Sequence, residues 1–404
     1  MGRTLGLLAF AAVLCISFRT PFEWGFFGHR LINRMAVFTL PPELIKIYKP
    51  HIEFVAAHAV DPDKRRYSTV HEAVRHYIDL DHWGHYPFDN LPRNWDKALI
   101  KFCDLTCVFA NGDTVVLRGM DLDSTWSENQ FYQPQYMQQF DRHTYQSFFR
   151  KHILPGYFED PWEVPVDSFE IYFTLPTSPA LRDISVQDTL SRTGILPYHL
   201  TSMQQQLTRA FVEKDLSKIL RLSTDLGHYI GDAHVPLHTT TNYDGQLTNQ
   251  QGIHAFWESR LPELFAEDTY DFFVGKANYI NDPVEFYWNI VLQTNLLVDQ
   301  VLDLENQLRN DYPSDQQYCF DERLDFTVRT QCREYAAAYH NLLAGQVEMQ
   351  MRKSVLAVGS AWYSAWIDAG QPDLGSESTL IEFGMTETGS KAKLLKGKLG
   401  RRHE

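Results

Sequence analysis

Beyond its first residues the sequence has no apolar stretch long enough to cross a bilayer, so we expect no stable membrane span. It has no internal repeat and no glycine-rich loop of the kind that cradles phosphate groups. Basic charge is scarce, because 37 lysines and arginines stand against 51 aspartates and glutamates, for a net charge of −14. We therefore do not expect broad electrostatic binding of nucleic acid, and metal ions would have to attract any phosphate substrate.

Cysteine is also infrequent, with five in 404 residues. Cys15 falls in the apolar first stretch, which leaves Cys103, Cys107, Cys319 and Cys332. An even number in an oxidising compartment allows two disulfides in three pairings, although Cys103 and Cys107 could instead be buried thiols. The cysteines lie far along the chain from the histidine-rich motifs, which argues against a cysteine-based zinc site.

The two ends of the chain differ from its middle. Arg3 followed by the apolar stretch Leu5 to Phe18 is typical of an export signal, so we predict a signal peptide at 1–23 and a secreted or periplasmic protein. At the other end the hydrophobic spacing fades, and residues 391–404 contain six lysines or arginines. We predict a flexible basic tail at 371–404, more typical of a solvated end than of a binding arm.

Hydrophobic periodicity between these ends predicts a mainly helical protein. Apolar residues recur every three to four positions from Leu200 to Val235, from the Asp282-Pro283 start through Leu308, and from Arg333 to Trp366, with shorter helices expected at Gly28 to Thr39 and Pro42 to Ala59. Each long stripe predicts one amphipathic helix. The fold class we expect is all-α.

Residues 86–192 interrupt the helical pattern. This stretch has scattered prolines and aromatics and short β-like pieces at Thr114 to Leu117 and Phe169 to Phe173. We predict a single mainly helical domain at 24–370 that contains residues 86–192 as a long insertion or lid of mixed structure.

The richest motif runs from Leu226 to Ser259. His228 and Asp232 stand four residues apart, as do His254 and Glu258, so on a helix each pair shares one face and can close on one ion. His238 follows beyond the helix-stopping Pro236 and can turn back as a further ligand. Imidazole and carboxylate ligands without thiolate suit catalytic zinc better than structural zinc.

Further positions complete a recognisable pattern. The sequence WGFFGH spans Trp24 to His29, and Asp61, in HAVDPDKRR, precedes His76 by fifteen residues. Together with GDAHVPLH and IHAFWES, these motifs resemble the family of zinc-dependent phospholipases C and single-strand-specific nucleases. The Trp24 to His29 spacing and the wording of the two later motifs are nearer to the nuclease branch.

The resemblance implies three zinc ions inside an α-helical domain. One ion would be held by Asp61, His76, His228 and Asp232. A second would be held by His238, His254 and Glu258. Asp232 would bridge to a third ion, whose other ligands would be His29 and the amino group and carbonyl oxygen of Trp24.

Such a cluster is suited to hydrolysis of a phosphodiester. Zinc lowers the pKa of bound water to about 7, so a hydroxide is available to attack phosphorus at neutral pH. We expect Asp61 to be the catalytic carboxylate that orients this water. Lys64 or Arg65 could stabilise charge on the phosphoryl oxygens, although the nuclease branch places an arginine three residues after the aspartate, where this chain has Lys64.

Three functions are compatible with these residues. The first is a secreted nuclease acting on single-stranded DNA or RNA, with removal of 3′-phosphate from nucleotides as an added activity. The second is a phospholipase C acting on phospholipid headgroups, which Glu258 favours because phospholipases of this family carry glutamate there and the nucleases usually aspartate. The third is a non-catalytic zinc-binding interaction protein whose insertion blocks the cleft. No obligate protein partner is evident.

Overall fold

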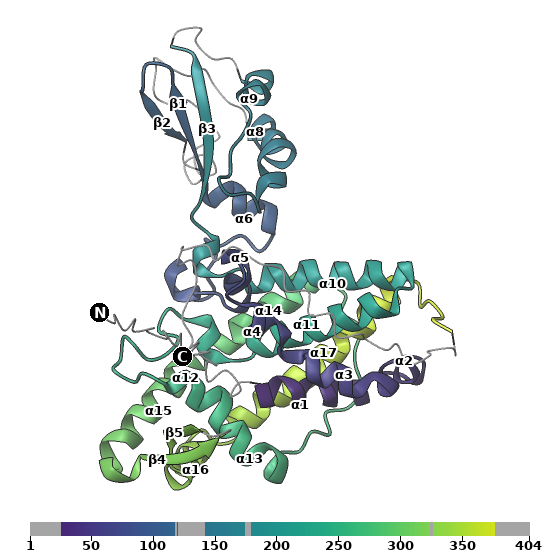
Figure 1. Cartoon of the computed structure of the whole chain (residues 1–404), viewed down its shortest axis with the longest axis vertical. Coiled ribbons are helices and arrows are strands. Elements are labelled where there is room, and N and C mark those ends of the chain that lie inside the picture. The colour runs from purple at the N-terminus through teal and green to yellow at the C-terminus, as the bar shows by residue number, and fades with distance from the viewer. Residues whose placement is uncertain (1–25, 118, 120–141, 174–178, 324–325, 376–404) are drawn as a thin grey trace, which may run out of the picture.

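The computed structural model describes residues 26–117, 119, 142–173, 179–323 and 326–375. These residues form a body of packed helices and a smaller module of helices and sheet that stands away from it (Figure 1). The fold is mainly helical, as the periodicity predicts. The predicted signal peptide, Trp24 and residues 376–404 of the predicted tail lie outside the described residues. Within the described part of the chain, no helix is long and apolar enough to cross a membrane.

Five helices make the centre of the body: α1 (Phe26–Ala36), α10 (Leu196–Glu213), α11 (Leu216–Ala233), α14 (Pro283–Asn295) and α17 (Gln346–Asp368). Helix α17 packs against α1, α10 and α11, and α10 also contacts α14 (Figure 1). Helix α11 is therefore covered on several sides. Its carboxyl-terminal half, which carries the predicted ligands, is buried in the core.

Shorter elements surround this centre. On the amino-terminal side they are α2 (Pro42–Tyr48), α3 (Ile52–Ala57), the 3₁₀ turn η3 (His58–Val60), α4 (Asp61–Arg65), α5 (Val70–Ala73) and the 3₁₀ turn η4 (Val74–His76). After α11 come the 3₁₀ turn η9 (Pro236–Thr239), α12 (Ile253–Ala255), the π-helix η10 (Phe256–Arg260), α13 (Leu261–Thr269), α15 (Val298–Asp311) and α16 (Arg333–Leu342). A disulfide between Cys319 and Cys332 ties the hairpin of β4 (Tyr318–Arg323) and β5 (Phe326–Gln331) to the start of α16.

The module contains α6 (Trp95–Phe102), β1 (Cys103–Phe109), β2 (Thr114–Leu117), α8 (Arg142–Phe148), α9 (Val166–Tyr172) and β3 (Leu181–Asp188), all within the predicted insertion 86–192. Its antiparallel sheet has the order β2-β1-β3, and Cys107 of β1 pairs with Val115 on one side and Ile184 on the other. Cys103 and Cys107 are free and buried, which is the alternative to a second disulfide. Burial raises the pKa of the Cys107 thiol to about 12, so it is unreactive at neutral pH.

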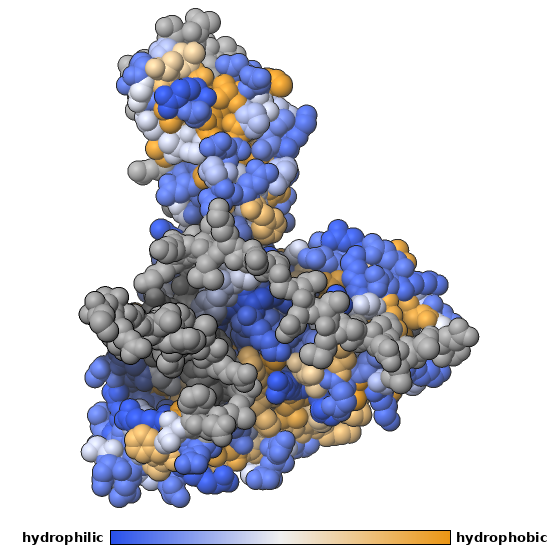
Figure 2. All heavy atoms as spheres, viewed as in Figure 1, coloured by the Kyte–Doolittle hydropathy of each residue, from blue (hydrophilic) through white to orange (hydrophobic). Residues whose placement is uncertain are grey.

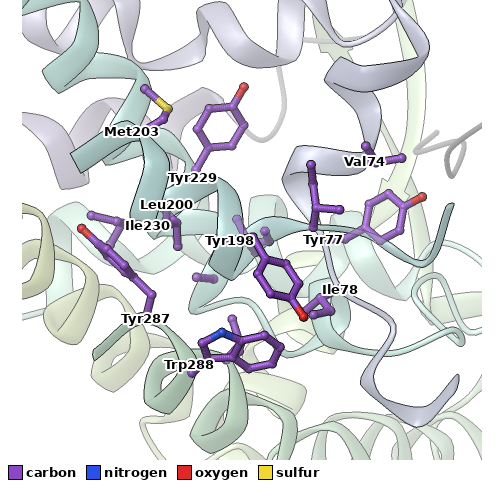
Figure 3. Close-up of a cluster of buried hydrophobic side chains, with 14 of the residues drawn as sticks. Val74, Tyr77, Ile78, Tyr198, Leu200, Met203, Tyr229, Ile230, Tyr287 and Trp288 are labelled. Carbon is purple, nitrogen blue, oxygen red and sulfur yellow. The ribbon is translucent and has the colours of Figure 1, made fainter. Parts of the chain in front are cut away.

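A cluster of buried aromatic side chains joins the central helices (Figure 3). Tyr198 of α10 packs edge-on against Trp288 of α14, and its hydroxyl donates to the carbonyl of Pro92 at 2.6 Å. The neighbouring Tyr287 donates its hydroxyl to the side chain of Gln204 at 2.5 Å. Because these buried hydroxyls are satisfied, the rings contribute their apolar area to the core without the cost of an unpaired polar atom.

The described surface is mostly polar on the face that Figure 2 shows. In the view of Figure 2, hydrophilic residues cover most of the described surface, and smaller hydrophobic areas lie on both module and body. The exposed large apolar residues of the module include Val116, Phe158 and Ile171. Scattered exposed side chains of this kind are normal on soluble proteins and do not by themselves mark a binding surface.

The three long-helix predictions were wrong in one respect, because each stripe is divided between two helices. In the first, Lys214 adopts a left-handed conformation (φ 55°) and Asp215 caps α11, accepting a hydrogen bond from the Lys218 amide. In the third, Ala344 and Gly345 both have positive φ between α16 and α17. Two consecutive helices that face one core keep a continuous apolar stripe, so the stripe alone does not reveal the turn.

Other local predictions had mixed outcomes. Asp282 caps α14 by accepting from the Glu285 amide, and Pro283 stands in its first turn, as predicted. The second stripe nevertheless ends this helix at Asn295, before α15 begins. The strand at Thr114 to Leu117 is confirmed as β2. The strand predicted at Phe169 to Phe173 was wrong, because residues up to Tyr172 form α9, whose Phe169 is buried against Phe148 of α8.

Candidate metal centre

Side chains of the kind that bind metal converge beside the carboxyl-terminal half of α11. They come from seven elements: His29 (α1), Asp63 (α4), His76 (η4), His228 and Asp232 (α11), His238 (η9), His254 (α12) and Glu258 (η10). Every one of the imidazoles is buried, while the carboxylates of Asp63 and Glu258 are 18% and 15% exposed. The described residues therefore contain groups that could hold a metal ion. Within these groups, the Asp63 and Glu258 carboxylates are the parts most exposed to solvent.

The first group consists of Asp63, His76, His228 and Asp232. Nδ1 of His76 lies 2.9 Å from Oδ2 of Asp232 and 3.2 Å from Nε2 of His228, which is itself 3.3 Å from the same oxygen. Oδ1 of Asp63 lies 3.6 Å from the His228 nitrogen and 3.8 Å from the His76 nitrogen. Four ligands placed 2.0–2.1 Å from a zinc ion lie about 3.3 Å from one another at the corners of a tetrahedron. The distances among His76, His228 and Asp232 fit that geometry, and Asp63 lies slightly farther from the two imidazoles.

The second group consists of His238, His254 and Glu258. The two Nε2 atoms lie 3.2 Å apart, and Oε2 of Glu258 lies 2.8 Å from His254 and 3.5 Å from His238. Three ligand atoms at these distances occupy one face of a tetrahedron. These three side chains could hold one metal ion.

The third group links the other two through His29. Its Nε2 lies 3.4 Å from Oδ1 of Asp232 and 3.3 Å from Oε1 of Glu258. Asp232 thus turns one oxygen to the first group and the other to His29, and Glu258 does the same from the second group. The predicted further ligand, Trp24, lies outside the described residues.

Close packing of α1 on α11 brings His29 into place. A β-carbon added at Gly231 would lie 2.8 Å from Nδ1 of His29, and one added at Gly227, a turn earlier, would lie 2.0 Å from the side-chain oxygen of Asn33. The two glycines therefore permit this approach. His254 lies on α12, and Glu258 follows it on the π-helix η10. Such π-helical turns are often found at functional sites.

Backbone carbonyls fix the orientation of three of the histidines. Nδ1 of His228 donates to the carbonyl of Ala59 at 2.9 Å, and Nδ1 of His254 donates to that of Tyr243 at 3.0 Å. Nδ1 of His238 donates to the carbonyl of His76 at 2.5 Å. In each case Nδ1 carries the proton, so the lone pair of Nε2 points into the cluster, as a metal ligand requires.

Burial sets the protonation state of these imidazoles. It lowers the pKa of His76 and His228 well below the ordinary value and that of His238 to about 4, so all three are neutral at pH 7. For His29 burial acts in the same direction, but the hydrogen bond to Glu258 and the surrounding carboxylates outweigh it and raise the pKa to about 9.

The negative charges of the neighbouring carboxylates affect one another's pKa. Burial, together with the charge of Glu258, raises the pKa of both Asp63 and Asp232. Burial has the same tendency at Glu258, but its hydrogen bonds with His238, His254 and His29 hold its pKa well below the ordinary value. Neutral imidazoles beside crowded carboxylates are the conditions under which a divalent cation is bound favourably.

The structure corrects the sequence prediction at Asp61. This side chain is 33% exposed and turns away from the cluster, where its carboxylate meets Nδ1 of His58 at 2.5 Å and Nζ of Lys64 at 2.9 Å. Asp63 takes its place beside His76 and His228. Residues two apart on a helix point in nearly opposite directions, so in α4 Asp61 faces outward and Asp63 inward.

The two predicted phosphate contacts are likewise absent from the cluster. Lys64 is half-exposed and paired with Asp61. Arg65 is bound to Glu72 at 2.8 Å and to Asp225 at 2.8 Å, on the outer side of α11. In the described structure both side chains are engaged by carboxylates outside the three metal-binding groups.

Arg66 is the residue that the sequence reasoning missed. It is 3% exposed, and within the described part of the chain its Nε and one terminal nitrogen have no hydrogen-bond partner. Its charge acts on Asp63, His76, Asp232 and His238, which belong to the first and the second group. A sequence pattern could have identified it. Arg66 is the third residue after Asp63, which is the spacing from aspartate to arginine that the resemblance to the nuclease branch predicts.

Comparison with known proteins adds no further assignment. No protein-family model, curated protein or solved structure matches the chain.

Proposed function

We propose that the protein is a secreted zinc-dependent phosphodiesterase that cleaves single-stranded DNA or RNA. The observation that carries the proposal is the convergence of eight ligand side chains, together with a buried arginine, Arg66, whose Nε and one terminal nitrogen have no hydrogen-bond partner among the described residues. A guanidinium without an anion is costly to bury, so a buried arginine beside a metal centre is suited to receive an anionic group such as a phosphate. The disulfide is compatible with an oxidising compartment.

The residues present fit up to three zinc ions. Asp63, His76, His228 and Asp232 would hold one ion, and His238, His254 and Glu258 would hold a second. His29 and Asp232 would contribute to a third. When bound, zinc lowers the pKa of a coordinated water to about 7 and so supplies a nucleophile at neutral pH.

The protein's own side chains account for the remaining requirements of phosphodiester hydrolysis. Arg66 would bind the non-bridging oxygens of the phosphate and stabilise the charge that develops on them. Asp63, which is partly exposed, takes the water-orienting role that the sequence assigned to Asp61. The proton on Nδ1 of His228, His238 and His254 is held by backbone carbonyls, which keeps these rings in one orientation during the reaction.

The choice between nucleic acid and phospholipid depends on two positions. Arg66 stands three residues after the inward-facing Asp63, which is the spacing of the nuclease branch. Glu258 is the residue usual in the phospholipases, so hydrolysis of phospholipid headgroups is the second candidate function. We favour the nuclease. Aspartate and glutamate can both bind zinc, so Glu258 discriminates weakly, whereas the buried Arg66 is suited to bind a phosphate and has the spacing of the nuclease branch.

The test uses the secreted full-length protein with two substrates, a single-stranded DNA oligonucleotide and phosphatidylcholine vesicles. We expect the oligonucleotide to be cleaved, cleavage to stop with a chelator and to return on addition of zinc, and the vesicles to be hydrolysed far more slowly. Faster phosphatidylcholine hydrolysis would support the phospholipase instead. Tightly bound metal with neither activity would contradict both and favour the non-catalytic zinc-binding protein.

A further inference from the structure

A cavity lies behind His29, on the side of the ring that faces away from the predicted metal positions. It lies between α1, α11, η10, α13 and α17, is partly open to solvent, and leaves a volume of about 30 Å³ to the centres of water molecules. Its lining is mostly apolar, from Ile32, Val235, Trp257, Val347 and Met351. Its polar lining comes mainly from His29 and Glu258 of the predicted site and from Gln350 and Ser354 of α17. The cavity therefore lies between the predicted site and the last helix of the body.

Two buried polar atoms on opposite walls of this cavity have no partner in the described part of the chain. One is Nδ1 of His29 and the other is Oε1 of Gln350, and both residues line the cavity. The side chains are 4% and 2% exposed. Buried polar atoms are almost always hydrogen-bonded to protein or to ordered water. Two such atoms that line one cavity without a protein partner therefore point to a ligand that both of them bind.

The orientation of the Gln350 amide follows from its other contacts. Its Nε2 donates to the carbonyl of His234 at 2.8 Å and to the hydroxyl of Thr294 at 3.2 Å. Both bonds require the nitrogen to face α11 and α14, because carbonyl and hydroxyl oxygens accept them. Oε1 is therefore left as a fixed acceptor at the cavity wall.

His29 has need of such an acceptor. To bind metal through Nε2, which faces Asp232 and Glu258, the ring must carry its proton on Nδ1. Backbone carbonyls accept that proton from His228, His238 and His254. No carbonyl within the described residues does so for His29.

We propose that the cavity is a hydration site in which ordered water joins Nδ1 of His29 to Oε1 of Gln350, and that Gln350 is thereby a positioning residue for the third metal ion. The proposal rests on the metal-binding function proposed above. A water molecule needs about 10–15 Å³ of such volume, so the cavity has room for about two bridging waters. Water that bridges two polar groups is nearly as favourable as a direct hydrogen bond.

The chain offers a matched control on the same helix. Gln346, one turn before Gln350, is also buried and accepts from Trp257 Nε1 while donating to Gln300, but it does not line the cavity. Gln350→Met and Gln346→Met each remove a buried amide and keep similar volume. Gln350→Glu keeps an oxygen acceptor at the cavity wall.

The experiment measures zinc bound per chain, and the affinity of each ion, for the full-length wild type and these three variants. We expect Gln350→Met to weaken the most loosely held ion by about 10- to 100-fold, the usual effect of losing a group that orients a metal-ligating histidine. Gln346→Met should bind zinc as the wild type does, although both methionine variants lose stability. Gln350→Glu should retain the third ion. A cobalt-substituted protein gives a second readout, because loss of one ion changes the visible absorption spectrum.

The outcomes separate this proposal from the function on which it rests. A wild type that binds no zinc would overturn the proposed function itself. A wild type that binds three ions, with the same affinities in Gln350→Met, would overturn the role of Gln350 alone. Equal weakening in Gln350→Met and Gln346→Met would also overturn it, since the effect would then be one of general stability. A small organic molecule in the cavity of the metal-loaded crystal, in place of water, would contradict the hydration site.

Discussion

Asp63 and Arg66 lie on the same face of one short helical segment, where the Arg66 amide donates a hydrogen bond to the Asp63 carbonyl at 3.1 Å. They are three residues apart at α4 and its carboxyl-terminal end, so their side chains point in the same direction. Asp61 and Lys64, which have the same spacing two positions earlier, form an ion pair on the outer face. The two faces provide matched pairs of residues for testing which of them serves the site.

Replacing the buried arginine should reduce catalysis without removing metal. We expect Arg66→Gln to lower kcat/KM for single-stranded DNA by about 100-fold or more, as is typical when a donor to a developing oxyanion is lost. Lys64→Gln removes a charge two positions away and should change kcat/KM less than about threefold, because its exposed ion pair contributes little. Equal losses in both variants would contradict the assignment.

Removing the inward carboxylate should weaken metal binding. In Asp63→Asn the first group loses an anionic ligand, and we expect the affinity for zinc to fall more than about 100-fold, beyond the loss usual for groups outside the coordination sphere. The control is Asp61→Asn, which should keep the zinc affinity of the wild type. Calorimetric titration of the metal-free protein measures both, and a greater loss in Asp61→Asn would restore the original ligand set.

Crowding His29 should affect one ion selectively. Gly231→Ala places a methyl group 2.8 Å from Nδ1 of His29, and overpacking of this kind costs about 1–3 kcal/mol. Gly359→Ala, on α17, clashes instead with Thr39, which lies ten residues after His29. Both variants should unfold at lower urea concentration than the wild type. Bound zinc should fall below the wild-type count in Gly231→Ala and stay unchanged in Gly359→Ala, and the reverse pattern would refute the placement of His29.

The metal-free protein should lose stability as the pH falls below 6.5. Burial lowers the pKa of His234 to about 4, while in the unfolded chain this ring keeps its ordinary value of 6.5. Between these values the unfolded state binds a proton that the folded state does not, so the free energy of unfolding decreases, by about 3 kcal/mol in all for this group. His234→Asn, whose amide can still donate to the Ile230 carbonyl, should show a shallower decrease in urea titrations from pH 7 to pH 4. An identical slope in the two proteins would show that His234 does not titrate in this way.

Much of the candidate site could be predicted from the sequence because its residues lie in local motifs. His228 and Asp232, and His254 and Glu258, converge as their four-residue spacing indicates, even though the second pair begins on α12 and ends on a π-helix. The predicted ligand Asp61 lies two positions before Asp63, the carboxylate that joins the cluster. The segment that contains it is five residues long, too short to show which face is buried, so only packing against α11 separates Asp61 from Asp63.

The sequence predicted the mainly helical class of the fold but not where its long apolar stripes divide into separate helices. The apolar stripe from Leu200 to Val235 is real, yet the turn at Lys214 depends on a left-handed residue that is not glycine, which the sequence does not mark. Gln350 and its cavity could not be predicted at all. Their relation to His29 joins the first helix of the body to the last, a contact set by tertiary packing rather than by local pattern.

Anomalous X-ray scattering at the zinc absorption edge, from crystals of the zinc-loaded secreted protein, tests the metal centre most directly. The account predicts one peak about 2.0–2.2 Å from the ligand atoms of Asp63, His76, His228 and Asp232, and a second at the same distance from His238, His254 and Glu258. Peaks confined to the protein surface, or an absence of peaks beside His228 and His254, would contradict it.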